Sequence, residues 1–243
     1  MWRAMRISLL ALALGAGLGL AALLAFLPAL RGAACPRCFG LDPAGAGLWV
    51  EASMPAHARV ALAAEVRAAR ARIAAFYGPP RAHLRLIACE SAACDRRLGG
   101  RGAAAVTYSL GPVSVVRLAP RGLSATVLTH ELAHAETHAQ LGLRGQLGGR
   151  LPTWFDEGLS VVISDDPRYL GPGQGAARCR RAPRADLPET PFDWAPLAAR
   201  DPGLYAEAGC AVLRWLAAEG GAAGLRDLFS GAADPRAGRG PVR

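Results

Sequence analysis

Apolar residues recur every three to four positions in several stretches of the chain, which is the spacing of one side of an α-helix. In the first stretch, residues 56–77, the side chains of Val60, Val66 and Ile73 would form a buried stripe along one side of the helix. Gly78 and the prolines after it end that stretch, and Gly142 ends the second. The predicted helices cover residues 56–77, 124–141, 153–164, 203–219 and 222–229.

Shorter apolar or alternating runs between the first two helices have the pattern of β-strands. These strands cover residues 84–88, 104–109 and 113–118, and a loop rich in glycine, proline and arginine is expected over 171–202. Because a helix is followed by strands and then by further helices, the sequence predicts an α+β fold with one small sheet.

The amino-terminal segment is almost wholly apolar from Ile7 to Leu30 and follows two basic residues, Arg3 and Arg6. About 20 apolar residues suffice to cross a bilayer as a helix, whereas the core of a signal peptide has about 7–15. Basic residues before a first span stay in the cytoplasm. We therefore expect residues 1–30 to form a single-pass membrane anchor with the rest of the chain on the periplasmic side. A cleaved signal segment and a secreted protein are the alternative.

The rest of the chain divides by composition into three parts. Residues 31–55 are rich in glycine, alanine and proline and are expected to form a stalk. Residues 56–231 hold the helical and strand patterns and are expected to form one domain of ordinary size. Residues 232–243 are polar and glycine-rich and are expected to form a flexible tail.

Composition argues against two broad classes of protein. With 52% hydrophobic and 19% charged residues, the chain has enough apolar surface to fold and is not intrinsically disordered. The net charge of +9 depends on 28 basic residues, all arginine, which are scattered and not interleaved with aromatic residues. Nucleic acid is therefore not an expected partner. The densest arginine cluster, at 178, 180, 181 and 184, is read as a solvated loop, with docking to an anionic lipid or polymer as the alternative.

Six cysteines, an even number, suit an oxidising compartment. They are Cys35, Cys38, Cys89, Cys94, Cys179 and Cys210. The middle pair lies close enough in the sequence for a local disulfide, and the last pair would tie the long loop to a late helix. The first pair forms a CxxC motif, read as a third disulfide or as a pair without function. Their connectivity is left open, and a four-cysteine zinc site is not supported because a second CxxC is absent from the sequence.

The stretch from His130 to His134 reads HELAH inside a predicted helix. A helix turns by about 100° per residue, so positions four apart lie on one face, one turn from each other. The two imidazoles can therefore hold one Zn²⁺, and Glu131 can reach a water on that metal. The metal lowers the pKa of such a water towards about 7, and the carboxylate takes its proton. This pattern predicts metal ligands at His130 and His134 and a general base at Glu131.

A catalytic zinc site usually takes three protein ligands and keeps one position open. The next predicted helix supplies the third candidate, Glu157, one turn from its start. Asp156 competes for this role, but Thr153 and Asp156 resemble a capping box that would occupy the aspartate at the helix end. We therefore expect Glu157 to complete the site with His130 and His134.

HELAH followed by LPTWFDEGL resembles the gluzincin metallopeptidases, in particular the bacterial peptidase MA-like group. Members of that group carry HExxH and then a Trp-x-x-Glu-Gly segment on the next helix. The resemblance covers roughly residues 56–230, but its specific part is confined to these two motifs. It implies a zincin-like fold with a small mixed sheet packed on the HExxH helix, and a peptide or protein substrate. It also implies a Zn²⁺ cofactor held by His130, His134 and Glu157, with Glu131 as the general base.

The same resemblance assigns roles to residues outside the two motifs. It makes the strand 113–118 the edge strand that borders the cleft, where an extended peptide can pair by backbone hydrogen bonds, with an ordinary internal strand as the alternative. One position departs from the thermolysin-type pattern, because Val161 stands where an aspartate would orient a histidine. Glu136 is a candidate for that orienting role, with a plain surface position as its alternative.

The remaining histidines and two tyrosines are weaker candidates for the site. His138 continues the series of histidines, but it lies about 80° around the helix from the first of them and two turns away, so one metal cannot easily meet all three. Tyr205 is the first candidate for stabilising the oxyanion of the reaction and Tyr169 the second, with packing as the alternative for both. His57 and His83 lack ligand spacing.

Taken together, these patterns predict a membrane-anchored, extracytoplasmic zinc peptidase with Glu131 as its general base. The alternative is a non-catalytic binding or assembly module of the cell envelope, in which a zincin-like fold binds peptide without cleaving it. Because the base and all three ligand candidates are present, the sequence favours the enzyme.

Overall fold

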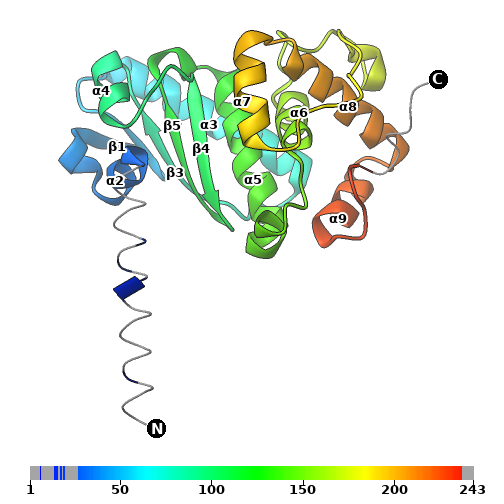
Figure 1. Ribbon diagram of the computed structural model, residues 1–243. Helices are drawn as coiled ribbons and strands as arrows, with labels where there is room; N and C mark the ends of the chain where they lie inside the picture. Colours follow the sequence, from blue (N-terminus) through cyan, green and yellow to red (C-terminus); the bar gives the residue numbers. More distant parts are fainter. Residues whose placement is uncertain (1–5, 7–13, 16, 18, 20–26, 237–243) are drawn as a thin grey trace.

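The computed structural model describes residues 6, 14, 15, 17, 19 and 27–236 (Figure 1). In this part of the chain, a mixed five-stranded sheet and eight α-helices confirm the α+β class predicted from the sequence. The sheet lies on one side of α5 (Ala125–Leu147). On the other side lie α6 (Thr153–Ser164), α7 (Pro191–Arg200) and α8 (Leu204–Ala218).

The other elements are short except for one long helix behind the sheet. The strands are β1 (Leu41–Gly45), β2 (Leu48–Glu51), β3 (His83–Ala88), β4 (Ala105–Leu110) and β5 (Val113–Leu118). The remaining helices are α2 (Pro28–Ala34), α3 (Ala56–Tyr77), α4 (Ala92–Arg97) and α9 (Ala222–Ser230). The short 3₁₀-helices are η1 (Pro36–Phe39), η2 (Pro120–Gly122) and η3 (Gly175–Arg178).

The segment 31–55, expected to be a stalk, is part of the folded domain. Its strands β1 and β2 form an antiparallel hairpin, and β2 pairs in parallel with β3. Gly47 in the hairpin has φ 72°, and a Cβ there would come within 2.6 Å of the carbonyl oxygen of Leu84, so glycine allows this close approach. The composition was misleading because glycine and proline mark tight turns as well as linkers.

The edge of the sheet differs from the expectation. The strand order in the described part of the chain is β1-β2-β3-β5-β4, so the strand 113–118 (β5) lies inside the sheet, and β1 and β4 are its two edge strands. β5 is fully paired, in parallel with β3 and antiparallel with β4. The free backbone edge beside α5 therefore belongs to β4. The prediction that 113–118 is the edge was wrong, and the alternative of an internal strand is confirmed.

Both faces of the sheet are buried, as the alternation of side chains along β3 shows. Leu86 and Ala88 join the main core with residues of α3 and α5, whereas Ile87 packs on the opposite face with residues of α2 and α4. On that opposite face the buried Arg117 of β5 pairs with Asp95 of α4. The sheet is thus a fixed support against which α5 is held.

Two glycines shape the helices that carry the candidate site. At Gly142 the backbone leaves helical geometry (φ 65°), so α5 kinks where the sequence predicted its end and continues to Leu147. At Gly158 of α6 a Cβ would overlap the carbonyl oxygen of Ala208 in α8. This close packing fixes α6 against α8 and holds the start of α6 beside α5.

The predicted loop 171–202 contains η3 and also α7, which the sequence reading missed. Thr190 caps α7 by accepting a hydrogen bond from the backbone N–H of Asp193, and Pro191 occupies the first helical position. These are ordinary start signals for a helix. Pro196 inside the helix made the segment look like a loop.

Three disulfides hold the described chain together, with the pairings that the cysteine spacing favoured. They are Cys35–Cys38, Cys89–Cys94 and Cys179–Cys210. The last of these ties the loop after α6 to α8, behind the candidate site. It closes the longest loop of the three, and long loops give the largest loss of entropy in the unfolded chain.

Both ends of the chain are described only in part. The membrane segment expected over residues 1–30 falls mainly on residues outside those described, and among the described residues no helix is long and apolar enough to span a membrane. In the expected tail, Arg236 forms an ion pair with Glu189, while residues 237–243 lie outside the described part.

Candidate metal centre

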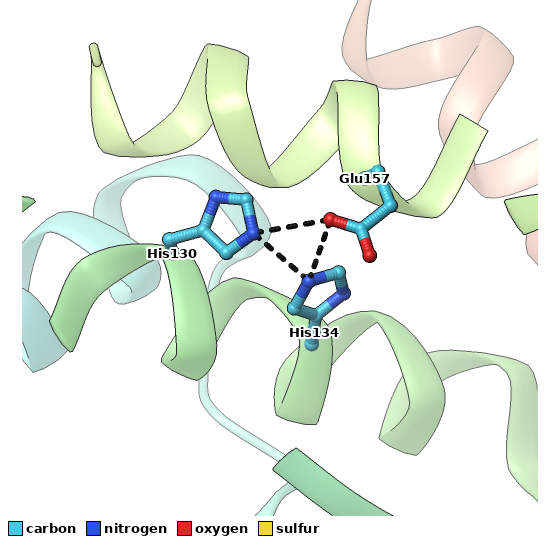
Figure 2. Close-up of side chains that lie close together, drawn as sticks. All are labelled: His130, His134 and Glu157. Atoms are coloured by element: carbon cyan, nitrogen blue, oxygen red, sulfur yellow. Dashed lines mark hydrogen bonds and ion pairs between the residues drawn. The ribbon is translucent and has the colours of Figure 1, made fainter. Parts of the chain in front are cut away.

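Three predicted ligands meet between α5 and α6. His130 and His134 project from α5, and Glu157 projects from the first turns of α6 (Figure 2). The two Nε2 atoms are 3.0 Å apart. The Glu157 Oε2 atom lies 3.3 Å from Nε2 of His130 and 3.5 Å from Nε2 of His134. Of the described residues, these three form a cluster able to hold a metal ion.

The spacing of the three donor atoms fits a small divalent cation. Ligands at about 2.0–2.1 Å from a tetrahedral metal lie about 3.3–3.4 Å from one another. The observed separations of 3.0, 3.3 and 3.5 Å lie around that value. Two imidazole nitrogens and one carboxylate oxygen also leave a fourth position open, as catalytic sites of this kind require.

Asp156 orients one of the ligands. Its Oδ2 atom accepts a hydrogen bond from Nδ1 of His134 at 2.9 Å, which leaves Nε2 of that ring with its lone pair towards the cluster. The same oxygen lies 2.9 Å from Nε2 of His138. The capping box expected from Thr153 and Asp156 does not form, because Pro152 is the N-cap residue and has no side-chain capping bond. Asp156 therefore supports the histidines rather than the end of the helix.

The charges in the cluster favour a bound cation. Burial opposes a charge on His134, but Asp156 and Glu157 outweigh it and hold the pKa of this imidazole well above its ordinary value. Burial would likewise raise the pKa of Glu157, yet the two histidines lower it to about 2. The pKa of Asp156 is also lowered, against burial, by His134 and His138. Both carboxylates are thus ionised at neutral pH and attract a positive charge, which a metal supplies when it replaces the proton on His134.

Glu131, the predicted general base, lies beside the cluster on α5 and is held by a neighbour that the sequence reading missed. The hydroxyl of Thr107 on β4 donates to Oε2 of Glu131 at 2.6 Å and to the backbone carbonyl of the same residue at 3.2 Å. Thr107 thereby fixes the carboxylate against the edge strand. Only the pairing of α5 with β4 reveals this contact, because the two residues are 24 positions apart.

Glu136 does not orient a histidine. Its carboxylate accepts hydrogen bonds from the backbone N–H groups of Arg81 and Ala82 and from the side chain of Gln140. It is also fully buried, so a plain surface position is wrong as well. This side chain joins α5 to the segment before β3, and the orienting role belongs to Asp156.

The two candidate tyrosines lie together next to the cluster. The ring of Tyr205 on α8 is 6.3 Å from that of His130 and stacks on Tyr169 at 5.1 Å. Burial raises the pKa of both tyrosines, so each keeps its proton and remains a hydrogen-bond donor. His57 and His83, the two histidines without ligand spacing, are exposed and lie outside the cluster.

The cluster opens into a cleft of about 1280 Å³. One wall is the edge strand β4 with the residues before it, from 101 to 107. The opposite wall includes Trp194 and Ala198 of α7 and Tyr205 of α8. The floor contains the ligand residues and Glu131, so a substrate lying along β4 would pass directly over them.

We expect Asp156→Asn to weaken metal binding by about 10–100-fold, because it removes the charge that orients His134 and favours a cation. The affinity is measured by competition with a chromophoric chelator. Asp186→Asn is the matched control, since Asp186 is exposed and belongs neither to the cluster nor to the lining of the cleft. Unchanged affinity in Asp156→Asn would show that this aspartate does not support the site.

A comparison with models of known protein families finds no match, and a comparison with curated proteins finds none either. The geometry of the site and the motif that supplies it are therefore what indicates a function for this protein.

Proposed function

We propose that this protein is a zinc-dependent peptidase of the gluzincin type. The observation that carries the proposal is the cluster of His130, His134 and Glu157 with Glu131 beside it, at the floor of a cleft along a free strand edge. Two imidazoles and a carboxylate are a donor set typical of catalytic zinc, which supports zinc over magnesium or calcium.

The edge strand offers a way to hold the substrate. Within the residues that the structure describes, β4 pairs with β5 alone, and the opposite edge of its first half lines the cleft. An extended peptide can pair there through backbone hydrogen bonds, which align a peptide bond without reading its side chains. The strand expected to pair with the peptide was 113–118, and we propose β4 in its place.

The chain supplies the acid–base chemistry. When bound, a zinc ion supplies Lewis acidity and lowers the pKa of a coordinated water towards about 7. Glu131 takes a proton from the attacking water and later passes it to the leaving amine. Thr107 keeps the carboxylate in place by donating to Oε2 and leaves Oε1 for this transfer. Tyr205, protonated and next to His130, is the candidate donor to the developing oxyanion.

We further propose that the protein works outside the cytoplasm, anchored by its apolar amino-terminal segment. The uncharged run from Ile7 to Leu30 and the arginines before it support the anchor. Three disulfides support an oxidising compartment, because such bonds are rare in the cytoplasm.

The test is metal content and peptide hydrolysis of the full chain purified in detergent. We expect about one zinc per chain and cleavage of a quenched fluorescent peptide library, lost with 1,10-phenanthroline and restored by added zinc. A folded protein that binds zinc but cleaves none of the peptides would contradict the enzyme and support the binding or assembly module. A folded protein that binds no metal would contradict the metal centre itself.

A further inference from the structure

The charges along the cleft are unevenly balanced. Of the described residues, four arginines line it. Arg168 is paired with the buried Asp166, and Arg236 is paired with Glu189 and Asp234. These two guanidinium groups therefore have acidic partners within the protein.

The other two arginines lie at one end of the cleft and have no such partners. Within the described chain, Arg101 and Arg121 are exposed and form neither an ion pair nor a side-chain hydrogen bond. Arg101 stands just before β4, and Arg121 lies in η2. The two segments are in contact, because the backbone N–H of Ala119 donates to Ala104 at 2.9 Å and a Cβ at Gly122 would overlap the same carbonyl oxygen.

Among the described residues, each carboxylate that lines the cleft already has another partner or belongs to the metal cluster. Asp156 lies between two histidines, and Glu157 belongs to the metal cluster. Glu131 is held by Thr107 beside that cluster, and Glu189 is paired with Arg236. The end of the cleft at Arg101 and Arg121 is therefore positive whether or not a metal is bound.

The direction of β4 relates this end to the substrate. Thr107 contacts the general base, so the scissile bond lies near Thr107, and Ala105 and Ala104 line the cleft between it and Arg101. A peptide added antiparallel to β4, the more stable pairing, runs with its carboxyl end towards Ala105 and then Arg101. At about 3.3 Å per residue, a group about three to five residues beyond the scissile bond reaches the arginines.

We propose that Arg101 and Arg121 select substrates with a carboxylate on the carboxyl side of the scissile bond, either an acidic side chain or the chain terminus. This inference rests on the proposed peptidase function and names the class of substrate. The carboxylate forms ion pairs with the two guanidinium groups. These ion pairs are stronger at low salt, because fewer ions screen the charges.

Three peptides of one cleavable sequence test this. The first has glutamate at the fourth position after the scissile bond and an amidated carboxyl terminus. The second has neutral side chains and ends at that fourth position with a free carboxylate. The third has neutral side chains and an amidated carboxyl terminus. For the full-length wild type, we expect kcat/KM for either carboxylate peptide to exceed that of the neutral peptide by about three- to tenfold at low salt. In Arg101→Gln/Arg121→Gln this ratio falls to about one. Arg67→Gln, an exposed arginine outside the cleft, keeps the ratio.

A second readout does not depend on turnover. Binding of the three labelled peptides to the Glu131→Gln protein, measured by fluorescence anisotropy, should show the same order and lose it when both arginines are replaced. If peptides are cleaved but all three give equal kcat/KM and equal affinity, the selection is contradicted while the peptidase stands. If nothing is cleaved but the carboxylate peptides bind through the arginines, the selection stands and the peptidase is contradicted. A preference for only one of the two carboxylate peptides supports the selection and shows whether the arginines bind an acidic side chain or the carboxyl terminus of the substrate.

Discussion

Replacing Glu131 with glutamine is expected to remove most of the peptide hydrolysis while leaving the metal bound. Glutamine keeps the size of the side chain and can still accept the hydrogen bond from Thr107, but it cannot take a proton from water. General-base catalysis contributes about 10²–10⁴-fold, so kcat/KM should fall by that factor. The measurement is hydrolysis of a single cleavable peptide together with the metal content of the same sample.

The matched control is Glu65→Gln, because Glu65 is exposed on α3 and does not line the cleft. It should cleave the peptide at the wild-type rate. Wild-type activity in Glu131→Gln would show that another group takes the proton. Loss of both metal and activity would show that Glu131 belongs to the ligand set instead.

Replacing His130 with alanine is expected to remove the metal and with it the activity. This histidine supplies one of three donor atoms, and its loss leaves His134 and Glu157 alone, which weakens binding by more than the roughly 100-fold upper limit for an outer-shell partner. His130 does not contact Asp156, so the pair between Asp156 and His134 survives in the variant. The measurement is metal content after dialysis against a weak chelator.

His57→Ala is the control, since His57 is exposed and lies outside the cluster. Circular dichroism establishes that both variants are folded. His134→Ala should also lose the metal, but it removes one histidine partner from each of two partly buried carboxylates, Asp156 and Glu157, and is expected to be less stable as well. Full metal content in His130→Ala would remove this residue from the ligand set.

Local patterns predicted the parts of the site that belong to single elements. The bounds of α3 and α6 match the predicted ranges, because helical periodicity and the glycines and prolines at helix ends act within a few residues. The spacing of His130 and His134 places both rings on one face of α5 by helix geometry alone. Even so, Val60 of the predicted stripe is 70% exposed. The buried face of the helix is narrower than the set of its apolar residues, because an apolar side chain is not always buried.

Contacts between distant segments were beyond the sequence reading. Asp156 looked like a capping residue and proved to orient His134, because the distance between α5 and α6 decides which carboxylate meets which ring. Glu136 looked like a candidate partner and instead binds backbone N–H groups before β3. In both cases the residue type was recognised and the partner was not.

The sequence by itself determined which candidate groups this protein carries: two histidines one helical turn apart, a candidate base beside the first, a glutamate on the next helix, and an even number of cysteines. The tertiary structure decided where that chemistry faces. It put β1 and β2 into the sheet, made β4 the free edge, set Thr107 against Glu131 and left Arg101 and Arg121 at one end of the cleft. The physical reason is that the spacing of the two histidines follows from the pitch of one helix, whereas the strand order and the charge of the cleft follow from packing between segments far apart in the chain.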